Sequence, residues 1–204
     1  MSETTQNWDD IAAVLDQGWI CHLGVSDANG TPTSLPMLYV RDGSSLVLHG
    51  GIANTTLQAA TQRARVFGNV TLVDGLVVAR SAFHSSVAYR SVTVGGTLSL
   101  IDDSDKSEAL ERVTEGLLPG RLEEIRSMTS GEVRGTVVLR LNIKEAVLRH
   151  SPSEVHDSPS DQSGPGWAGV IPIRVAAETP IPAADVASGT PLPQSVQRWS
   201  PPRG

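Results

Sequence analysis

Hydrophobic residues recur first at helical spacing and then at the alternating spacing of strands. Near the N-terminus they fall on one side of a predicted helix over 8–17. Asn7 suits the N-cap of that helix and Gly18 suits its end. Beyond Gly18 the alternation becomes extended, which predicts that the rest of the N-terminal half is built mainly of strands.

Three strands follow, separated by short turns. Asn29-Gly30 and Asp42-Gly43 are pairs typical of two-residue hairpin turns. Pro36 interrupts the second strand, and a proline inside a strand predicts an edge position or a bulge. Because short turns join neighbouring strands, the three form an antiparallel meander. The predicted strands cover 19–25, 34–41 and 45–49.

The next segments continue the same alternation. Asn54 suits the N-cap of a short helix, Asp74-Gly75 reads as a third hairpin turn, and Gly95-Gly96 permits a bend or a close backbone approach. Asp103 or Ser104 can cap an amphipathic helix. We expect helices over 55–63 and from about 104 to 120, and strands over 66–73, 76–80, 87–101 and 136–143, the last continuing toward Leu148.

The composition changes at about Ser151. Ten of the 13 prolines lie beyond it, after a linker rich in Ser, Asp and Gly. Within this part, Trp167–Ile173 is apolar enough to dock on the preceding domain, and 178–204 is typical of extended wrapping. We therefore divide the chain into one domain over 1–150 and a linker with a Pro-rich tail over 151–204.

Many short strands with few helices predict a mainly β fold, an antiparallel barrel rather than a parallel sheet. The net charge is −6 and aromatic residues make up 4% of the chain, which argues against nucleic-acid binding. Cys21 is the single cysteine, so a disulfide framework is excluded. The polar N-terminus and the lack of a long apolar run predict a cytoplasmic protein without a membrane segment.

Sequence motifs alone identify no reaction. The chain lacks a Gly-rich dinucleotide fingerprint, a phosphate loop and the Cys/His spacings of metal sites. We therefore predict no metal ligands from spacing.

Two long segments carry a resemblance to a known family. "LDQGWICHLGVSDANGTPTSLPMLYVRDGSSLVLHGG" and "VTLVDGLVVARSAFHSSVAYRSVTVGG" occur in the order and spacing of the pyridoxamine 5′-phosphate oxidase-like family. Within it the chain is most similar to the branch of nitroimidazole-resistance-type flavoproteins. The resemblance runs from about Leu15 to Ile143 and extends into the tail through "WAGVIPIR". It implies a six-stranded antiparallel split β-barrel.

Relatives of this kind are homodimers that bind FMN at the subunit interface, so the resemblance implies an FMN-dependent oxidoreductase acting on a small organic substrate. A helix N-terminus after the third strand would receive the cofactor phosphate, and Thr71 to Asp74, at the end of the fourth strand, would run beside the flavin ring. The implied cofactor-binding residues are His49, Gly50, Gly51, Asn54, Thr55, Thr71, Leu72, Val73, Asp74, Arg80, Ser81 and Arg90.

The phosphate-binding segment departs from the family pattern. Relatives usually carry a serine at position 51 and Ser-Arg at 54 and 55, where this chain has Gly51, Asn54 and Thr55. The change removes a charge-assisted phosphate contact. It favours, as an alternative, a protein without cofactor, used for binding or for a biosynthetic reaction.

His84 lies in the irregular segment between two strands, where functional residues concentrate. We predict His84 and next Tyr89 as the catalytic residues. A second alternative is haem in place of flavin, because an imidazole from His49 or His84 could ligate the iron.

Overall fold

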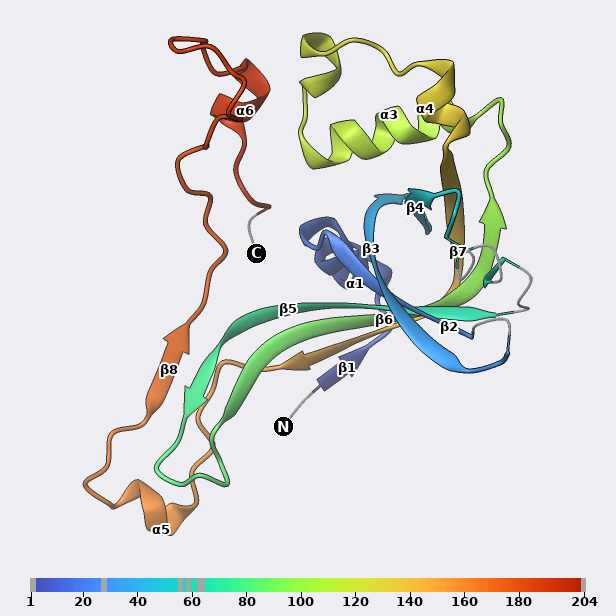
Figure 1. The fold of residues 1–204 in the computed structure, drawn as a ribbon. Helices are drawn as coiled ribbons and strands as arrows, with labels where there is room; N and C mark the ends of the chain where they lie inside the picture. Colours follow the sequence, from blue (N-terminus) through green and yellow to red (C-terminus); the bar gives the residue numbers. More distant parts are fainter. Residues whose placement is uncertain (1–2, 27–28, 55–56, 58–59, 62–64, 203–204) are drawn as a thin grey trace.

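The computed structural model describes residues 3–26, 29–54, 57, 60–61 and 65–202 (Figure 1). Six strands form a closed ring in the order β7-β4-β3-β2-β5-β6, and pairing between β6 and β7 completes it. This confirms the predicted six-stranded antiparallel split barrel. The ring strands are β2 (Ile20–Ser26), β3 (Pro32–Asp42), β4 (Ser45–Gly51), β5 (Val66–Val78), β6 (Ser86–Leu100) and β7 (Thr136–Ser151).

The predicted meander is confirmed in β2, β3 and β4. Strand β3 pairs with β2 from Ile20↔Leu38 to Ser26↔Pro32, and with β4 only from Tyr39 onward. Among the described strands, β3 therefore has a neighbour on one side only at Pro36, which is the edge position that a proline requires.

The predicted hairpin turn at Asp74-Gly75 is wrong. Strand β5 runs unbroken through it, with a register shift between Val73 and Gly75 against β6. A short tail strand, β8 (Gly169–Pro172), covers the other edge of β5 at this point. A Cβ on Gly75 would lie 2.8 Å from the carbonyl oxygen of Ile171, so glycine serves close strand packing here rather than a turn.

The close approach predicted at Gly95-Gly96 is confirmed. The β6–β7 register shifts between these two glycines. A Cβ on Gly96 would meet the carbonyl oxygen of Asn142 at 2.0 Å, so a side chain there would separate the strands that close the ring.

Helix α1 (Trp8–Gln17) has the predicted bounds, with the Asn7 side chain accepting from the N–H groups of Asp9 and Asp10. Its apolar side is buried, and Ile11 and Leu15 are each 1% exposed in the main core. The helix thus covers one face of the barrel sheet.

A second, smaller core lies under α3 (Lys106–Leu117), where Val113 packs with Val47 and Val138. This helix starts later than predicted, with Asp105 as its N-cap, and Leu118 lies beyond its end. Two short helices that the sequence did not predict follow it, η1 (Arg121–Glu124) and α4 (Ser130–Arg134). The helix predicted over 55–63 falls mostly outside the described residues, although Leu57 and Ala60 are described and buried.

The two ends of the chain add further pairings to the barrel. Strand β1 (Glu3–Thr5) pairs with β7. Strand β8 pairs with β5, which confirms the predicted docking of Trp167–Ile173 on the preceding domain. The tail also forms α5 (Pro159–Gln162) and α6 (Gln194–Arg198). In Figure 1, β5, β6 and β8 extend from the barrel as an arm with α5 at its tip, and the tail runs back toward α6 beside α3.

Contacts made by Trp199 and Ser195 hold the far end of the tail. The Trp199 indole N–H donates to the carbonyl oxygen of Leu117 at 2.7 Å, and its ring lies 5.8 Å from that of Trp19. The backbone N–H of Ser195 donates to Glu124 at 2.9 Å. Among the described residues, no helix is long and apolar enough to cross a membrane.

Candidate functional site

The predicted site residues fall in three places on the fold. His49 to Gly51 and Asn54 lie at the end of β4. Thr71 to Asp74 lie in the middle of β5, with Tyr89 and Arg90 beside them on β6. Arg80, Ser81 and His84 lie at the turn between β5 and β6, and Thr55 lies outside the described residues.

The middle of β5 has an open edge. Strand β2 pairs with β5 only over Phe67–Asn69, and β8 pairs with the same edge from Gly75 onward. No strand in the described part of the chain pairs with this edge over Val70–Val73. Backbone N–H and C=O groups at an open edge are available to a ligand. Thr71 to Val73 within this stretch are among the residues that the family resemblance implies beside the flavin ring.

A row of polar side chains lies on the outward face of β5 and β6 next to this edge. The Asn69 amide donates to Ser91 at 3.0 Å and to Thr93 at 3.1 Å. The Thr71 hydroxyl donates to the Asn69 amide oxygen at 2.9 Å and lies 2.8 Å from the Ser91 hydroxyl. The network holds these groups in fixed positions at the surface. Sequence reasoning missed Asn69, Ser91 and Thr93, although strand alternation puts them on the face of Thr71.

Arg90 and Asp74 form a bidentate ion pair beside the open edge. The guanidinium donates to the two carboxylate oxygens at 2.7 and 3.0 Å, and also to the Gln17 side chain at 3.0 Å. The hydrogen bonds that Arg90 donates to Asp74 raise the pKa of the guanidinium. Because both side chains are about one-quarter exposed, the pair joins β5, β6 and the end of α1 while remaining open to a ligand.

Arg90 also lines a pocket of about 440 Å³ between α1, β1 and β7. His150 and Leu148 line its β7 side, and Asp10 lines its α1 side. The sequence did not point to this pocket, because β1 carries only three residues and no strand pattern. His150 is exposed to solvent as well as lining the pocket.

At the end of β4, His49 has a buried polar atom without a partner. Its Nδ1 makes no hydrogen bond among the described residues. Burial lowers the pKa of the imidazole, which favours the neutral ring. A neutral imidazole with a free nitrogen is a good metal ligand.

The glycines and Asn54 after His49 are held by local packing. A Cβ on Gly50 would lie 2.7 Å from the Leu57 side chain, whereas a Cβ on Gly51 would have no atom of the described residues within 4 Å. The Asn54 side chain accepts from the N–H of Leu57 at 3.0 Å, as the predicted N-cap does.

The turn between β5 and β6 is tied to the tail. Arg80 donates to the buried Asp157 through its backbone N–H at 2.9 Å and its guanidinium at 2.6 Å. Ser81 bonds to Nδ1 of His84 at 2.9 Å. These three predicted residues therefore lie at the tip of the arm. They are separated from Thr71–Asp74, which lie in the middle of the arm.

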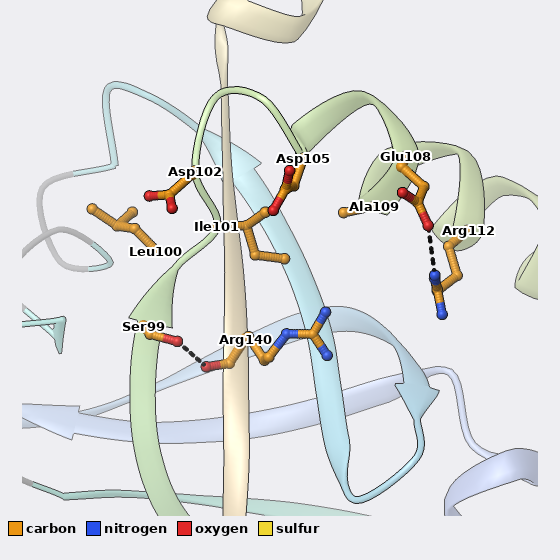
Figure 2. Close-up of a pocket in the computed structure, with 9 residues that line it drawn as sticks. All are labelled: Ser99, Leu100, Ile101, Asp102, Asp105, Glu108, Ala109, Arg112 and Arg140. Carbon is orange, nitrogen blue, oxygen red and sulfur yellow. Dashed lines mark hydrogen bonds and ion pairs between the residues drawn. The ribbon is translucent and has the colours of Figure 1, made fainter.

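A second pocket, of about 350 Å³, lies between the end of β6, α3 and β7 (Figure 2). Its two arginines, Arg112 and Arg140, both donate to Asp42, and Arg112 also donates to Glu108. Asp102 and Asp105 line the same pocket. Because the arginines are neutralised and acidic groups predominate, this pocket does not suit a phosphate.

Comparison with known proteins defines the class. The family described as pyridoxamine 5′-phosphate oxidase matches residues 7–150, and the chain belongs to this family. The FAD and heme binding protein from Mycobacterium smegmatis has a similar structure, with 36% identity over 95% of each chain and a TM-score of 0.91. The flavocytochrome Anf3 from Azotobacter vinelandii is 32% identical over 96% of this chain and 91% of its own, with a TM-score of 0.89.

A 5-nitroimidazole antibiotic resistance protein from Bacteroides thetaiotaomicron shares the fold at 19% identity, with a TM-score of 0.61 over 73% of this chain and 87% of its own. No curated protein matches the chain. The predicted membership of the family is thus confirmed, and solved structures of similar proteins include flavin- and haem-binding ones.

Replacing Asp74 with asparagine should destabilise the protein, because Arg90 would keep its burial and lose its charged partner. We expect Asp74→Asn to lower the free energy of unfolding by about 1–3 kcal/mol, measured by urea denaturation. Asp103→Asn is the control, since that carboxylate also pairs with a cation but is 90% exposed. Equal effects of the two substitutions would contradict a structural role for the Arg90–Asp74 pair.

Proposed function

We propose that this protein is a flavin- and haem-binding oxidoreductase in which the flavin is FAD. The observation that carries the proposal is the similarity of the whole chain, tail included, to two proteins named for these cofactors. Each match covers at least 95% of the chain, whereas the family match ends at residue 150. The family resemblance implied FMN. We propose FAD in its place because the similar M. smegmatis protein is named for FAD.

The middle of β5 fits a flavin. Val70–Val73 offers backbone donors and acceptors at an open edge, and the isoalloxazine ring has a polar edge that needs such partners. Arg90 adds a cation that stays protonated, since its pKa is raised by Asp74. The rigid Asn69–Thr71–Ser91 network would hold the adjacent surface in place.

The lack of basic residues in the segment after β4 favours FAD over FMN. The terminal phosphate of FMN, like a phosphate monoester on a side chain, carries about −1.5 to −2 at neutral pH. The diphosphate of FAD spreads its charge over two groups. Gly51 to Thr55 contains no lysine or arginine, so this segment suits a terminal phosphate poorly.

His49 fits the role of haem ligand better than His84 does. Burial keeps the His49 imidazole neutral, and its Nδ1 is buried without a partner among the described residues. His84 has its Nδ1 bonded to Ser81, and a nitrogen of the ring faces two carboxylates.

Flavin would supply hydride and single-electron transfer, and haem would supply single-electron transfer. The catalytic roles of His84 and Tyr89 stay predictions.

We also propose a homodimer with a small organic substrate, as the family resemblance implies. Large apolar side chains on the outward face of β5 support it, because Phe67 is 56% exposed and Val73 is 48% exposed. A second copy would bury them beside the open edge. The cytoplasmic location stays a prediction.

The absorption spectrum of the purified protein tests the cofactors. We expect flavin bands together with a Soret band, and FAD as the flavin released by heat and identified by chromatography. Release of FMN would contradict the choice of FAD. A colourless protein that binds neither added flavin nor added haem would contradict the proposal and leave the cofactor-free alternative.

A histidine substitution tests the haem ligand. His49→Ala should abolish the Soret band and keep the flavin bands, because the imidazole on β4 would ligate iron and not the flavin ring. His22→Ala, an exposed strand histidine, should keep both. If His49→Ala loses flavin and keeps the Soret band, then His49 contacts the flavin and the haem assignment is wrong.

Light scattering tests the assembly. We expect the molecular mass of a dimer, since a second copy would cover the exposed Phe67 and Val73 side chains on β5. A stable monomer at micromolar concentration would contradict a site shared between subunits.

A further inference from the structure

Three potential metal ligands meet at the tip of the arm, at a place that the proposed flavin and haem sites do not use. His84 comes from the turn between β5 and β6, whereas Asp157 and Asp161 come from the tail. One ligand atom of each residue lies within 4.8 Å of the other two. The spacing of the residues in sequence could not reveal this group, because 73 positions separate His84 from Asp157.

His84 is oriented toward the two carboxylates. Its Nδ1 bonds to the Ser81 hydroxyl at 2.9 Å, and its backbone N–H donates to the same oxygen at 3.3 Å. The Phe83 ring meets the imidazole edge-on at 5.1 Å. A second bond from the ring nitrogen that does not bind the ion is the usual way in which a protein fixes the orientation of a ligating histidine.

Each carboxylate also has its own supporting group. Arg80 donates twice to Asp157, whose side chain is 1% exposed. Ser158 donates to Asp161 at 2.7 Å and caps the short helix that carries it. The three candidate ligands are therefore positioned by three different neighbours, Ser81, Arg80 and Ser158, and each carboxylate oxygen retains a second lone pair for an ion.

The charges around the group are not balanced. Two carboxylates face one guanidinium, and one of the carboxylates is buried. Arg80 already compensates the buried Asp157, so the half-buried Asp161 is the carboxylate without a cationic partner of its own among the described residues. One imidazole nitrogen with two carboxylate oxygens is a ligand set that suits zinc and similar divalent ions, with water in the fourth position.

We propose that His84, Asp157 and Asp161 bind one divalent transition-metal ion of the zinc class. The ion fastens the tail to the turn between β5 and β6. Because Asp157 and Asp161 come from one segment and His84 from the other, the ion crosslinks two parts of the chain that Arg80 already joins through Asp157 and the carbonyl oxygen of Gly166.

Titration of the full-length, tag-free protein with Co²⁺ and Zn²⁺ tests the proposal, after removal of loosely bound metal with a chelator. We expect one ion per chain, the visible absorption of a Co²⁺ site with a nitrogen ligand, its displacement by Zn²⁺, and a higher Tm with metal. Flavin and haem spectra are recorded before each titration, so that cofactor loss and metal loss are read separately.

Variants assign the ligands. His84→Ala and Asp161→Asn should each weaken metal binding by more than about 100-fold, while Ser81→Ala, which removes only the orienting bond, should weaken it by about 10–100-fold. His156→Ala is the matched control, because this exposed tail histidine lies next to Asp157 and faces Glu154 instead. Circular dichroism checks that each variant is folded.

Two results would overturn the proposal. One is wild-type binding no tighter than that of His84→Ala, or binding lost in His156→Ala. The other is a Tm that neither Co²⁺ nor Zn²⁺ raises, which would mean that no ion fastens the tail to the turn between β5 and β6.

Discussion

Closure of the barrel by β7 is the constraint on which the rest of the structure depends. This strand pairs with β4, β6 and β1, so it joins the meander of the N-terminal half to the arm. The closure requires a close approach at Gly96, where any side chain would strike the backbone of Asn142. Because a closed ring leaves its strands few free edges, an open edge can exist only where a strand extends beyond the ring.

The open edge on β5 follows from that geometry. Strand β5 is longer than the pairing that β2 offers, and β8 of the tail covers only its far part. The uncovered stretch over Val70–Val73 therefore lies between the barrel and the tail, beside the Arg90–Asp74 pair. A cofactor site that depends on this gap depends on the tail as much as on the barrel, which agrees with similarity extending over the whole chain.

The tail is fixed at several points rather than wrapped loosely. It adds β8 to the sheet, places Asp157 against Arg80 at the tip of the arm, and sets Trp199 against Leu117 beside α3. Between β8 and α6 the tail is exposed. The arm is therefore held at its tip by charge and along its edge by backbone pairing, so its position does not rely on a hydrophobic core of its own.

The sequence by itself determined the elements whose signals are local. The helix capped by Asn7, the meander and the close approach at Gly96 all follow from spacing, capping and glycine placement, and the family followed from motifs in order. Asp74-Gly75 was misread as a turn because only β8, distant in sequence, shows why glycine is needed there. Likewise, tertiary structure alone showed that His49 and His84 lie in different surroundings. It also left one edge of β5 without a paired strand over Val70–Val73 and placed Asp157 next to His84. These features arise from contacts between residues far apart in the chain, and local periodicity carries no information about such contacts.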